Sequence, residues 1–311
     1  MRFGVQLLPQ DVSWSAWRDA WLRVDELGYD TNWSYDHVHA PRGDPASPCF
    51  EGWVGMAALG ALSRNARVGM AVSGVLYRNP ALLVKMATTL DHVTGGKTIF
   101  GIGAGWHESE HEGYGWGFPP PGERVSRLAE ALELTHALWS GGDPSQPVDY
   151  SGRYYALKRA YCNPAPLQKP HPPIMVAGSG PRIIGLVARY ADWWDTWAPV
   201  SEASQRHDRL KAACQKIGRP VSEITWSVST DMVCDNDAAR LADRVDAAVG
   251  RGTRDPAVAR SRMLVGGTEE VAEQVQAYAD AGVDHLLLHV GSPYDMRGVE
   301  TFAREVMPAF R

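Results

Sequence analysis

Short runs of β-branched and other apolar residues alternate along the chain with longer stretches in which apolar positions recur every three or four residues. A short run of this kind predicts a buried strand, and the longer spacing predicts an amphipathic helix. The alternation repeats about eight times. The predicted strands are Phe3–Leu7, Asp30–Ser34, Val68–Val72, Thr98–Ile102, Ile174–Ala177, Asp192–Thr196, Thr225–Met232 and His285–Val290.

The stretches between these strands are predicted helices. In the first, three tryptophans, a valine and a leucine between Trp14 and Leu27 fall on one helical face, and Gly28 ends the helix. The other predicted helices run from about Trp53 to Ser63, Pro80 to Val93, Gly122 to Trp139, Pro181 to Arg189, Ala203 to Ile217, Ala238 to Val249, Thr268 to Ala281 and Met296 to Met307.

Strand and helix in alternation require parallel strands, and a parallel sheet needs cover on both faces. The alternatives are an open doubly wound sheet and a closed (β/α)8 barrel. The 311 residues favour the α/β TIM barrel, because such a barrel takes about 250 residues and the remainder falls in two insertions. These insertions are Ser140–Pro173 after the fourth strand, with a predicted hairpin at Tyr150–Tyr155, and Gly250–Val265 after the seventh. Since no break in composition marks a second domain, residues 1–311 are predicted to form one domain.

Composition excludes several classes of function. With 31 Lys and Arg against 36 Asp and Glu, the net charge is −5, so no overall positive field attracts nucleic acid or an anionic membrane. No apolar run reaches the roughly 18 residues of a membrane span. The four cysteines form no C-x-x-C pair, which favours a cytoplasmic protein without a disulfide framework or a thiolate zinc site.

In such a barrel the active site lies at the C-terminal ends of the strands, so the residues that follow each strand are the candidates. Asp36 and His37 follow the second strand, with His39 next, and histidine suits proton transfer near neutral pH. The alternative is a solvated loop. After the third strand, Gly74 permits unusual backbone geometry in a turn that leads to Pro80, although an ordinary strand-to-helix turn explains it equally.

Two glycine-rich turns follow the fourth and fifth strands. Gly101, Gly103 and Gly105 let the backbone approach a ligand, but their spacing is not the dinucleotide-binding pattern G-x-G-x-x-G. The turn from Ala177 to Pro181 leads into a helix N-terminus, which favours a phosphate site, with a simple tight turn as the alternative.

The segment His107–His111 also matches H-E-x-x-H, in which two histidines bind zinc and Glu108 acts as general base. Tyr114 stands where the extended motif has glycine, and three prolines at 119–121 separate the histidines from a third ligand on the next helix. We therefore predict no bound metal and keep a zinc hydrolase as a remote alternative.

Together these segments resemble the bacterial luciferase-like superfamily, and within it the oxidoreductases that use the deazaflavin coenzyme F420. The resemblance rests on an ordered set of motifs that covers nearly the whole chain. They are Tyr35-Asp36-His37, Ser73–Ala81, Leu90-Asp91, Gly101–Trp106, Pro172–Ile174 and Ala177–Gly180. Members that use FMN share much of this pattern.

The resemblance implies a flavin-type ring at the barrel mouth, with Asp36 beside it and His37 as proton donor. It also implies that the Gly74–Val75 peptide is cis and bulges against the ring. The implied cofactor-binding residues are Asp36, Ser73, Gly74, Val75, Ala104, Gly105, Ser109 and Glu110 around the ring and its side chain, and Gly178, Ser179 and Gly180 at the phosphate.

The function implied is hydride transfer between reduced F420 and a small unsaturated substrate. Trp193, Trp194 and Trp197 indicate an apolar or aromatic substrate pocket. Trp106 stands where the sugar-phosphate dehydrogenases of the superfamily have a glutamate, which argues against sugar-phosphate oxidation. The alternatives are an FMN-dependent two-component monooxygenase and a binding subunit that has lost the cofactor. The expected partners are a small-molecule substrate and a second copy of the chain in a homodimer.

Overall fold

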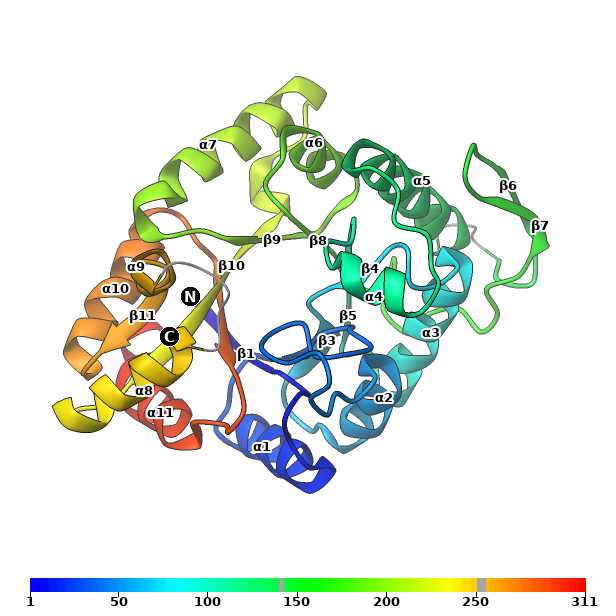
Figure 1. Cartoon of the computed structure of the whole chain (residues 1–311). Helices are drawn as coiled ribbons and strands as arrows, with labels where there is room; N and C mark the ends of the chain where they lie inside the picture. The colour runs from blue at the N-terminus through cyan, green and yellow to red at the C-terminus, as the bar shows by residue number, and fades with distance from the viewer. Residues whose placement is uncertain (140–142, 251–255) are drawn as a thin grey trace.

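The structure is a computed structural model that describes residues 1–139, 143–250 and 256–311. Eight parallel strands close into a barrel in the order β1, β2, β3, β5, β8, β9, β10, β12 and back to β1, with helices outside them (Figure 1). The predicted TIM-barrel fold is therefore confirmed. The barrel strands are β1 (Arg2–Leu7), β2 (Thr31–Ser34), β3 (Arg67–Met70), β5 (Thr98–Gly103), β8 (Ile174–Ala177), β9 (Trp193–Trp197), β10 (Thr225–Cys234) and β12 (His285–Val290).

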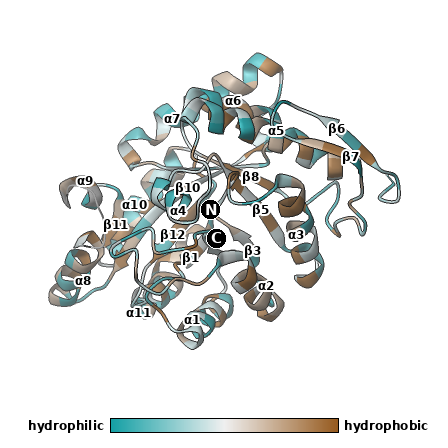
Figure 2. Ribbon diagram, turned by 45° about the vertical axis from the view of Figure 1, so that its right-hand side comes forward, coloured by the Kyte–Doolittle hydropathy of each residue, from teal (hydrophilic) through white to brown (hydrophobic). Residues whose placement is uncertain are grey.

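Most helices form where the apolar spacing predicts them, whereas two short ones, Glu108–Gly113 and Pro256–Arg260, have no predicted counterpart. Many of the helices carry hydrophobic and hydrophilic residues on different sides (Figure 2). In α1, the Ser13 side chain accepts the Ala16 amide as an N-cap, and Trp17 and Trp21 are fully buried. The helices are α1 (Trp14–Glu26), α2 (Gly52–Leu62), α3 (Pro80–Val93), α4 (Glu108–Gly113), α5 (Pro121–Trp139), α6 (Pro181–Tyr190), α7 (Val200–Ile217), α8 (Ala238–Gly250), α9 (Pro256–Arg260), α10 (Thr268–Asp280) and α11 (Met296–Thr301).

The apolar interior has two main parts. The larger lies between the strands and the surrounding helices. The smaller fills the barrel with side chains from five strands: Trp33, Ile99, Met175, Trp193 and Leu287. Because this layer occupies the barrel interior, a ligand has to bind above it, at the mouth.

The third strand differs from its prediction. Pairing stops at Met70, and a short strand, β4 (Ser73–Gly74), resumes beside β5. The non-proline cis peptide is Ala71–Val72, so its implied place at Gly74–Val75 is wrong. The Gly74–Val75 peptide instead continues the pairing with β5, since the Val75 amide donates to the Gly103 carbonyl over 2.9 Å.

The first predicted insertion forms the antiparallel hairpin β6 (Val148–Ser151) and β7 (Ala156–Ala160), which projects from the barrel in Figure 1. The second predicted insertion, Gly250–Val265, leads into a further strand at its end. There, β11 (Met263–Gly266) pairs in parallel with the last residues of β10, and α9 precedes it. The ten-residue β10 extends beyond its pairing with β9 and β12, so its last residues require another partner. Residues 140–142 and 251–255 of the insertions lie outside the described residues.

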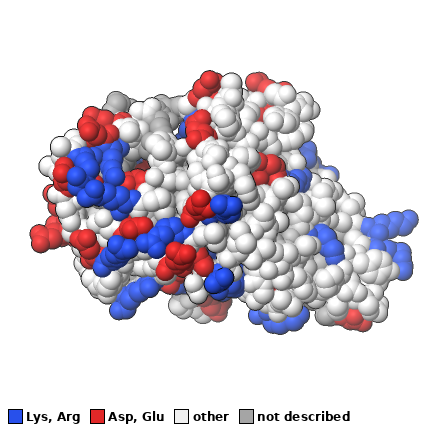
Figure 3. Space-filling view, turned by 90° about the horizontal axis from the view of Figure 1, so that it is seen from below, with Lys and Arg blue, Asp and Glu red and all other residues white. Residues whose placement is uncertain are grey.

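On the face shown in Figure 3, positive and negative residues are interspersed and separated by areas of other residues. Among the described helices, none is both long enough and apolar enough to cross a membrane.

Candidate active site

His37 and Glu110 form a hydrogen-bonded pair at the C-terminal mouth of the barrel. His37 follows β2, and Glu110 is a fully buried residue of the short helix α4 after β5. His37 Nδ1 lies 2.6 Å from Glu110 Oε2. The other carboxylate oxygen, Oε1, accepts the Val38 amide at 2.6 Å and the His39 amide at 3.4 Å. Glu110 therefore fixes both the His37 ring and the loop that carries it, and leaves Nε2 as the second polar atom of the ring.

Tyr77 completes this cluster from the loop after β4. Its hydroxyl donates to Glu110 Oε2 and lies 3.3 Å from His37 Nδ1. Burial raises the pKa of Glu110, but the hydrogen bonds from His37, Tyr77 and Val38 outweigh it and lower the pKa to about 2. Glu110 is therefore ionised at neutral pH.

Asp36 points away from His37 because consecutive residues at a strand end project in opposite directions. Its Oδ2 accepts from Arg78 Nη1 at 2.6 Å and from Trp53 Nε1 at 3.2 Å, and Arg78 also pairs with Glu51. Its other oxygen, Oδ1, is buried without a partner among the described residues. Burial raises the pKa of Asp36 above its ordinary value, and Arg78 acts against that shift. The carboxylate that contacts His37 is thus Glu110, although Asp36 precedes His37 in the sequence.

The predicted ring-binding residues form a row of small residues where three strands end side by side. Gly74 pairs with Gly103, and a Cβ atom placed on Gly103 would lie 4.0 Å from the carbonyl oxygen of Ala177. Gly105, with φ of +81°, and Ala104 continue the row beyond β5. Of the other predicted residues, Ser73 is buried under Trp53, Val75 is buried, and Ser109 lies between His39 and His107. Side chains lie close to both paired glycines: a Cβ on Gly74 would lie 2.9 Å from the Tyr77 ring, and a Cβ on Gly103 would lie 2.9 Å from Val72 Cγ2. Both positions therefore require a residue without a side chain.

The glycine turn after β8 has the donors that a phosphate requires. Gly178 has φ of +126° and donates its amide to the Asp195 carbonyl at 3.0 Å, so it shapes the turn. The amides of Ser179 and Gly180 have no acceptor among the described residues, and Gly180 caps α6 without a side chain. A Cβ on Gly180 would meet no atom within 4 Å. Free amides at a helix N-terminus beside open space suit a phosphate group.

The H-E-x-x-H segment does not present two histidines on one helix. His107 precedes α4 and its Nε2 lies 3.2 Å from Ser109 Oγ. The His111 ring stacks on Tyr77 with centroids 5.1 Å apart. Across the described ranges, no three His, Cys, Asp or Glu side chains are grouped so that they could hold a metal ion. The segment instead supplies Glu110 to the pair with His37.

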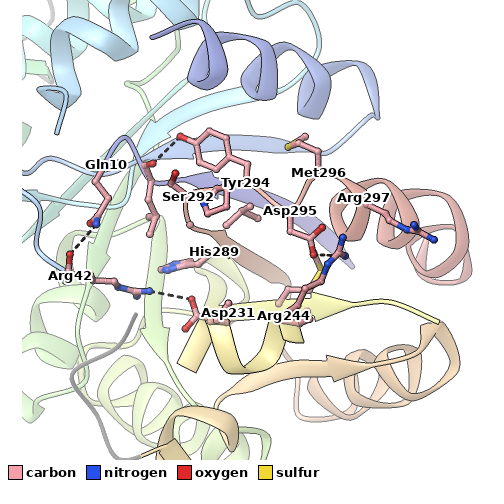
Figure 4. Close-up of a pocket in the computed structure, with 18 residues that line it drawn as sticks. Gln10, Arg42, Asp231, Arg244, His289, Ser292, Tyr294, Asp295, Met296 and Arg297 are labelled. Carbon is pink, nitrogen blue, oxygen red and sulfur yellow. Dashed lines mark hydrogen bonds and ion pairs between the residues drawn. The ribbon is translucent and has the colours of Figure 1, made fainter. Parts of the chain in front are cut away.

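A cavity of about 470 Å³ opens beside this cluster, at the ends of β1, β10 and β12 (Figure 4). Tyr35 connects the two: its ring meets the His37 ring edge-on at 4.9 Å, and its hydroxyl donates to Gln10 Oε1, in the cavity wall, at 3.2 Å. No motif in the sequence marks the polar wall residues of the cavity, which are Gln10, Arg42, Asp231 and His289. Asp231 and His289 fall in or beside predicted strands, and only their position at a strand end could have indicated them.

The family described as luciferase-like monooxygenase matches residues 1–285 of the chain. The chain belongs to this family. An F420-dependent glucose-6-phosphate dehydrogenase from Nakamurella multipartita is 27% identical, and the match covers 100% of this chain and 97% of that protein. The resemblance drawn from the motifs is thus confirmed.

Two solved structures share the fold of this luciferase-like chain. An F420-dependent secondary alcohol dehydrogenase, in complex with an F420-acetone adduct, matches with a TM-score of 0.88 at 20% identity, over 100% of this chain and 99% of that one. A monooxygenase from Streptomyces bottropensis matches with a TM-score of 0.82 at 20% identity, and the match covers 100% of both chains. Since the family and its full-length relatives are oxidoreductases, the chain is an oxidoreductase.

Proposed function

We propose that this luciferase-like protein is an F420-dependent oxidoreductase that transfers a hydride between the reduced deazaflavin and a small unsaturated substrate. The observation that carries the proposal is the pair of His37 with the ionised Glu110, beside a row of small residues and a turn with free amides. Relatives named as F420-dependent over the full length support the choice of cofactor.

The small residues from Gly74 to Gly105 would hold the ring, and the amides of Ser179 and Gly180 would hold the phosphate. When bound, the deazaflavin supplies or accepts the hydride. With Nδ1 bound to Glu110, His37 would donate its Nε2 proton to the substrate oxygen. Glu110 orients the ring and balances its positive charge when His37 is protonated.

The alternative is an FMN-dependent monooxygenase of the same fold, and the Streptomyces bottropensis structure shows that this fold also occurs in monooxygenases. The two proposals differ in their cofactor and in their need for oxygen. A proton donor held by a carboxylate matches reduction of a carbonyl group, in which one hydride and one proton are added.

Titration of the purified chain with F420 and with FMN, followed by fluorescence, tests the proposal. We expect tighter binding of F420, and oxidation of reduced F420 by a ketone without oxygen consumption. Tighter binding of FMN, together with oxygen consumption by the reduced flavin, would instead establish the monooxygenase. Failure to bind either cofactor would favour the binding subunit.

A further inference from the structure

The cavity beside the active-site cluster has an apolar body with polar groups at its rim. Leu8, Val233, Val290, Pro293 and Met296 contribute apolar surface to its wall. Its volume of about 470 Å³ lies within the range of small-molecule sites.

Two of the three arginines at this cavity are held in ion pairs. Arg42 Nη1 lies 3.4 Å from Asp231 Oδ1. Arg244 Nη1 lies 2.8 Å from Asp295 Oδ2 and 3.2 Å from Asp235, which is buried behind the wall. Arg297 lies 3.8 Å from the same Asp235 carboxylate, which also bonds to Arg240, and its side chain is 59% exposed. An anionic ligand therefore has to break an existing ion pair to reach Arg42 or Arg244.

The neutral polar side chains at the cavity are also hydrogen-bonded to the protein. Gln10 donates to the Arg42 carbonyl at 3.0 Å, Tyr294 donates to the Leu8 carbonyl at 2.8 Å, and Ser292 donates to the Asp11 carbonyl at 2.6 Å. These groups hold the loops after β1 and β12 in place and have little capacity left for a ligand.

His289 is different. It lies at the end of β12 beside Arg42 and Asp231, as Figure 4 shows, and it is 8% exposed. Neither ring nitrogen has a hydrogen-bond partner among the described residues. Its ring packs edge-on against Trp197 with centroids 4.4 Å apart, which orients it without satisfying either nitrogen. A buried polar group without a partner costs stability, so a ligand that supplies the partner recovers part of that cost.

Burial, together with the nearby Arg42, holds the pKa of His289 well below its usual range. The ring is therefore neutral, with one N–H donor and one acceptor nitrogen. A neutral imidazole bonds equally well to a carbonyl oxygen or to a hydroxyl group, and it gives an anion no charge to pair with.

We propose that His289 is a hydrogen-bonding anchor in this cavity, and that the cavity takes an uncharged molecule with an apolar body and a carbonyl or hydroxyl oxygen that bonds to His289. The proposal rests on the proposed function, because it assigns a substrate class to the same site.

The test is an NMR titration of the full chain, with oxidised F420 bound and again without it. The His289 ring signals are assigned by their loss in His289→Gln. The probes are cyclohexanone, its charged counterpart cyclohexanecarboxylate, and inorganic phosphate. We expect cyclohexanone to shift the His289 signals saturably, and the two anions to leave them unchanged at the same concentration.

Methyl signals of Met232 and Met296, both in the cavity wall, give the dissociation constant in each variant. We expect His289→Leu to weaken cyclohexanone binding about 3- to 10-fold, the range of one hydrogen bond. His289→Gln, which keeps a donor and an acceptor, should stay within about threefold of the unchanged chain. Equal F420 affinity in all three proteins checks that the variants are folded.

The proposal is overturned by unshifted His289 signals, by tighter binding of either anion, or by unchanged cyclohexanone affinity in His289→Leu. If cyclohexanone shifts the His289 signals in the absence of F420 and the chain does not bind F420, His289 remains the anchor of the cavity and the proposed F420-dependent function is wrong. The wild-type titration alone decides the matter if His289→Leu does not fold.

Discussion

His37 has one nitrogen held by Glu110 at 2.6 Å, so the ring is oriented before any substrate arrives. A general acid in a fixed orientation contributes about 10²–10⁴-fold to turnover. We therefore expect His37→Ala to lower turnover by that factor, while F420 affinity changes little because the amides of Ser179 and Gly180 lie on a different loop. Steady-state rates and fluorescence titration of the same variant measure the two quantities.

His39 is the matched control, two residues further along the same loop. Its Nδ1 lies 3.2 Å from the Ala40 carbonyl and its Nε2 lies 3.3 Å from Ser109 Oγ, so it makes no contact with Glu110 through its ring. We expect His39→Ala to leave turnover nearly unchanged. A dead His39→Ala beside an active His37→Ala would move the proton donor to His39, and activity in both variants would assign the proton to water.

At the scale of elements, the sequence predicts most of the fold because each apolar period belongs to one strand or helix. The strands β8 and β12 begin and end where predicted, as does α3. The misses arise where an element depends on a partner elsewhere in the chain. β11 is a short apolar run, Met263–Gly266, and it pairs only because β10 extends beyond the barrel.

The candidate site divides in the same way. The residues after the strands could be found from position alone, and Asp36, His37 and the glycine turns were found by this rule. The carboxylate that contacts His37 is set by the packing of α4 over the loop after β2. No local sequence pattern predicts the distance between these two segments. Arg78 and Trp53, which hold Asp36, were missed for the same reason.

The turn between β8 and α6 gives an element-scale prediction. Gly178→Asp would weaken cofactor binding, but it combines charge with backbone strain, because φ is +126° and the new Cβ would lie 3.3 Å from Ile183. Gly180→Asp adds the charge without backbone strain, because residue 180 faces open space at the N-cap of α6, where aspartate is a favoured residue. Its carboxylate would accept from the amides of the first turn of α6, and its negative charge would repel a phosphate at the Ser179 and Gly180 amides. We expect at least about fivefold weaker F420 binding at unchanged or increased thermal stability.

Gly185→Asp is the control for this turn, since it adds the same charge on the exposed side of α6. It should leave F420 affinity unchanged. Equal loss of affinity in both variants would indicate a general charge effect, and no loss in Gly180→Asp would remove the phosphate from this turn.

At the scale of the whole molecule, folding lowers the pKa of some carboxyl groups and raises that of others. Glu110 and Asp235 have their pKa lowered to about 2: in Glu110 by hydrogen bonds that outweigh burial, and in Asp235 mainly by its hydrogen bond with Arg240. Their folded pKa lies below the unfolded value, so the stability they contribute is present above about pH 4–5 and is lost as the pH falls towards 2. The protein should therefore unfold in acid.

Asp195 behaves in the opposite way. It is buried in β9, with Oδ2 accepting from Ser229 Oγ at 2.8 Å and Oδ1 without a partner among the described residues. Burial raises its pKa from 3.8 to about 6. Because the folded pKa exceeds the unfolded one, ionised Asp195 costs stability above pH 6, and protonation relieves that cost as the pH falls towards 4. The difference corresponds to about 3 kcal/mol.

Asp195→Asn should remove this cost and keep a similar shape. We expect the variant to be more stable than the unchanged chain by about 1–3 kcal/mol at pH 7.5, with a difference near zero at pH 4, where Asp195 is itself protonated. Urea denaturation at the two pH values measures both differences, and Ser229→Ala serves as control. Without the Ser229 hydroxyl the carboxylate loses its donor, so that variant should lose more stability at pH 7.5 than at pH 4. The prediction fails if the free energies of unfolding of Asp195→Asn and the unchanged chain differ by the same amount at both pH values. Asp195 would then not lie in a site that disfavours its charge.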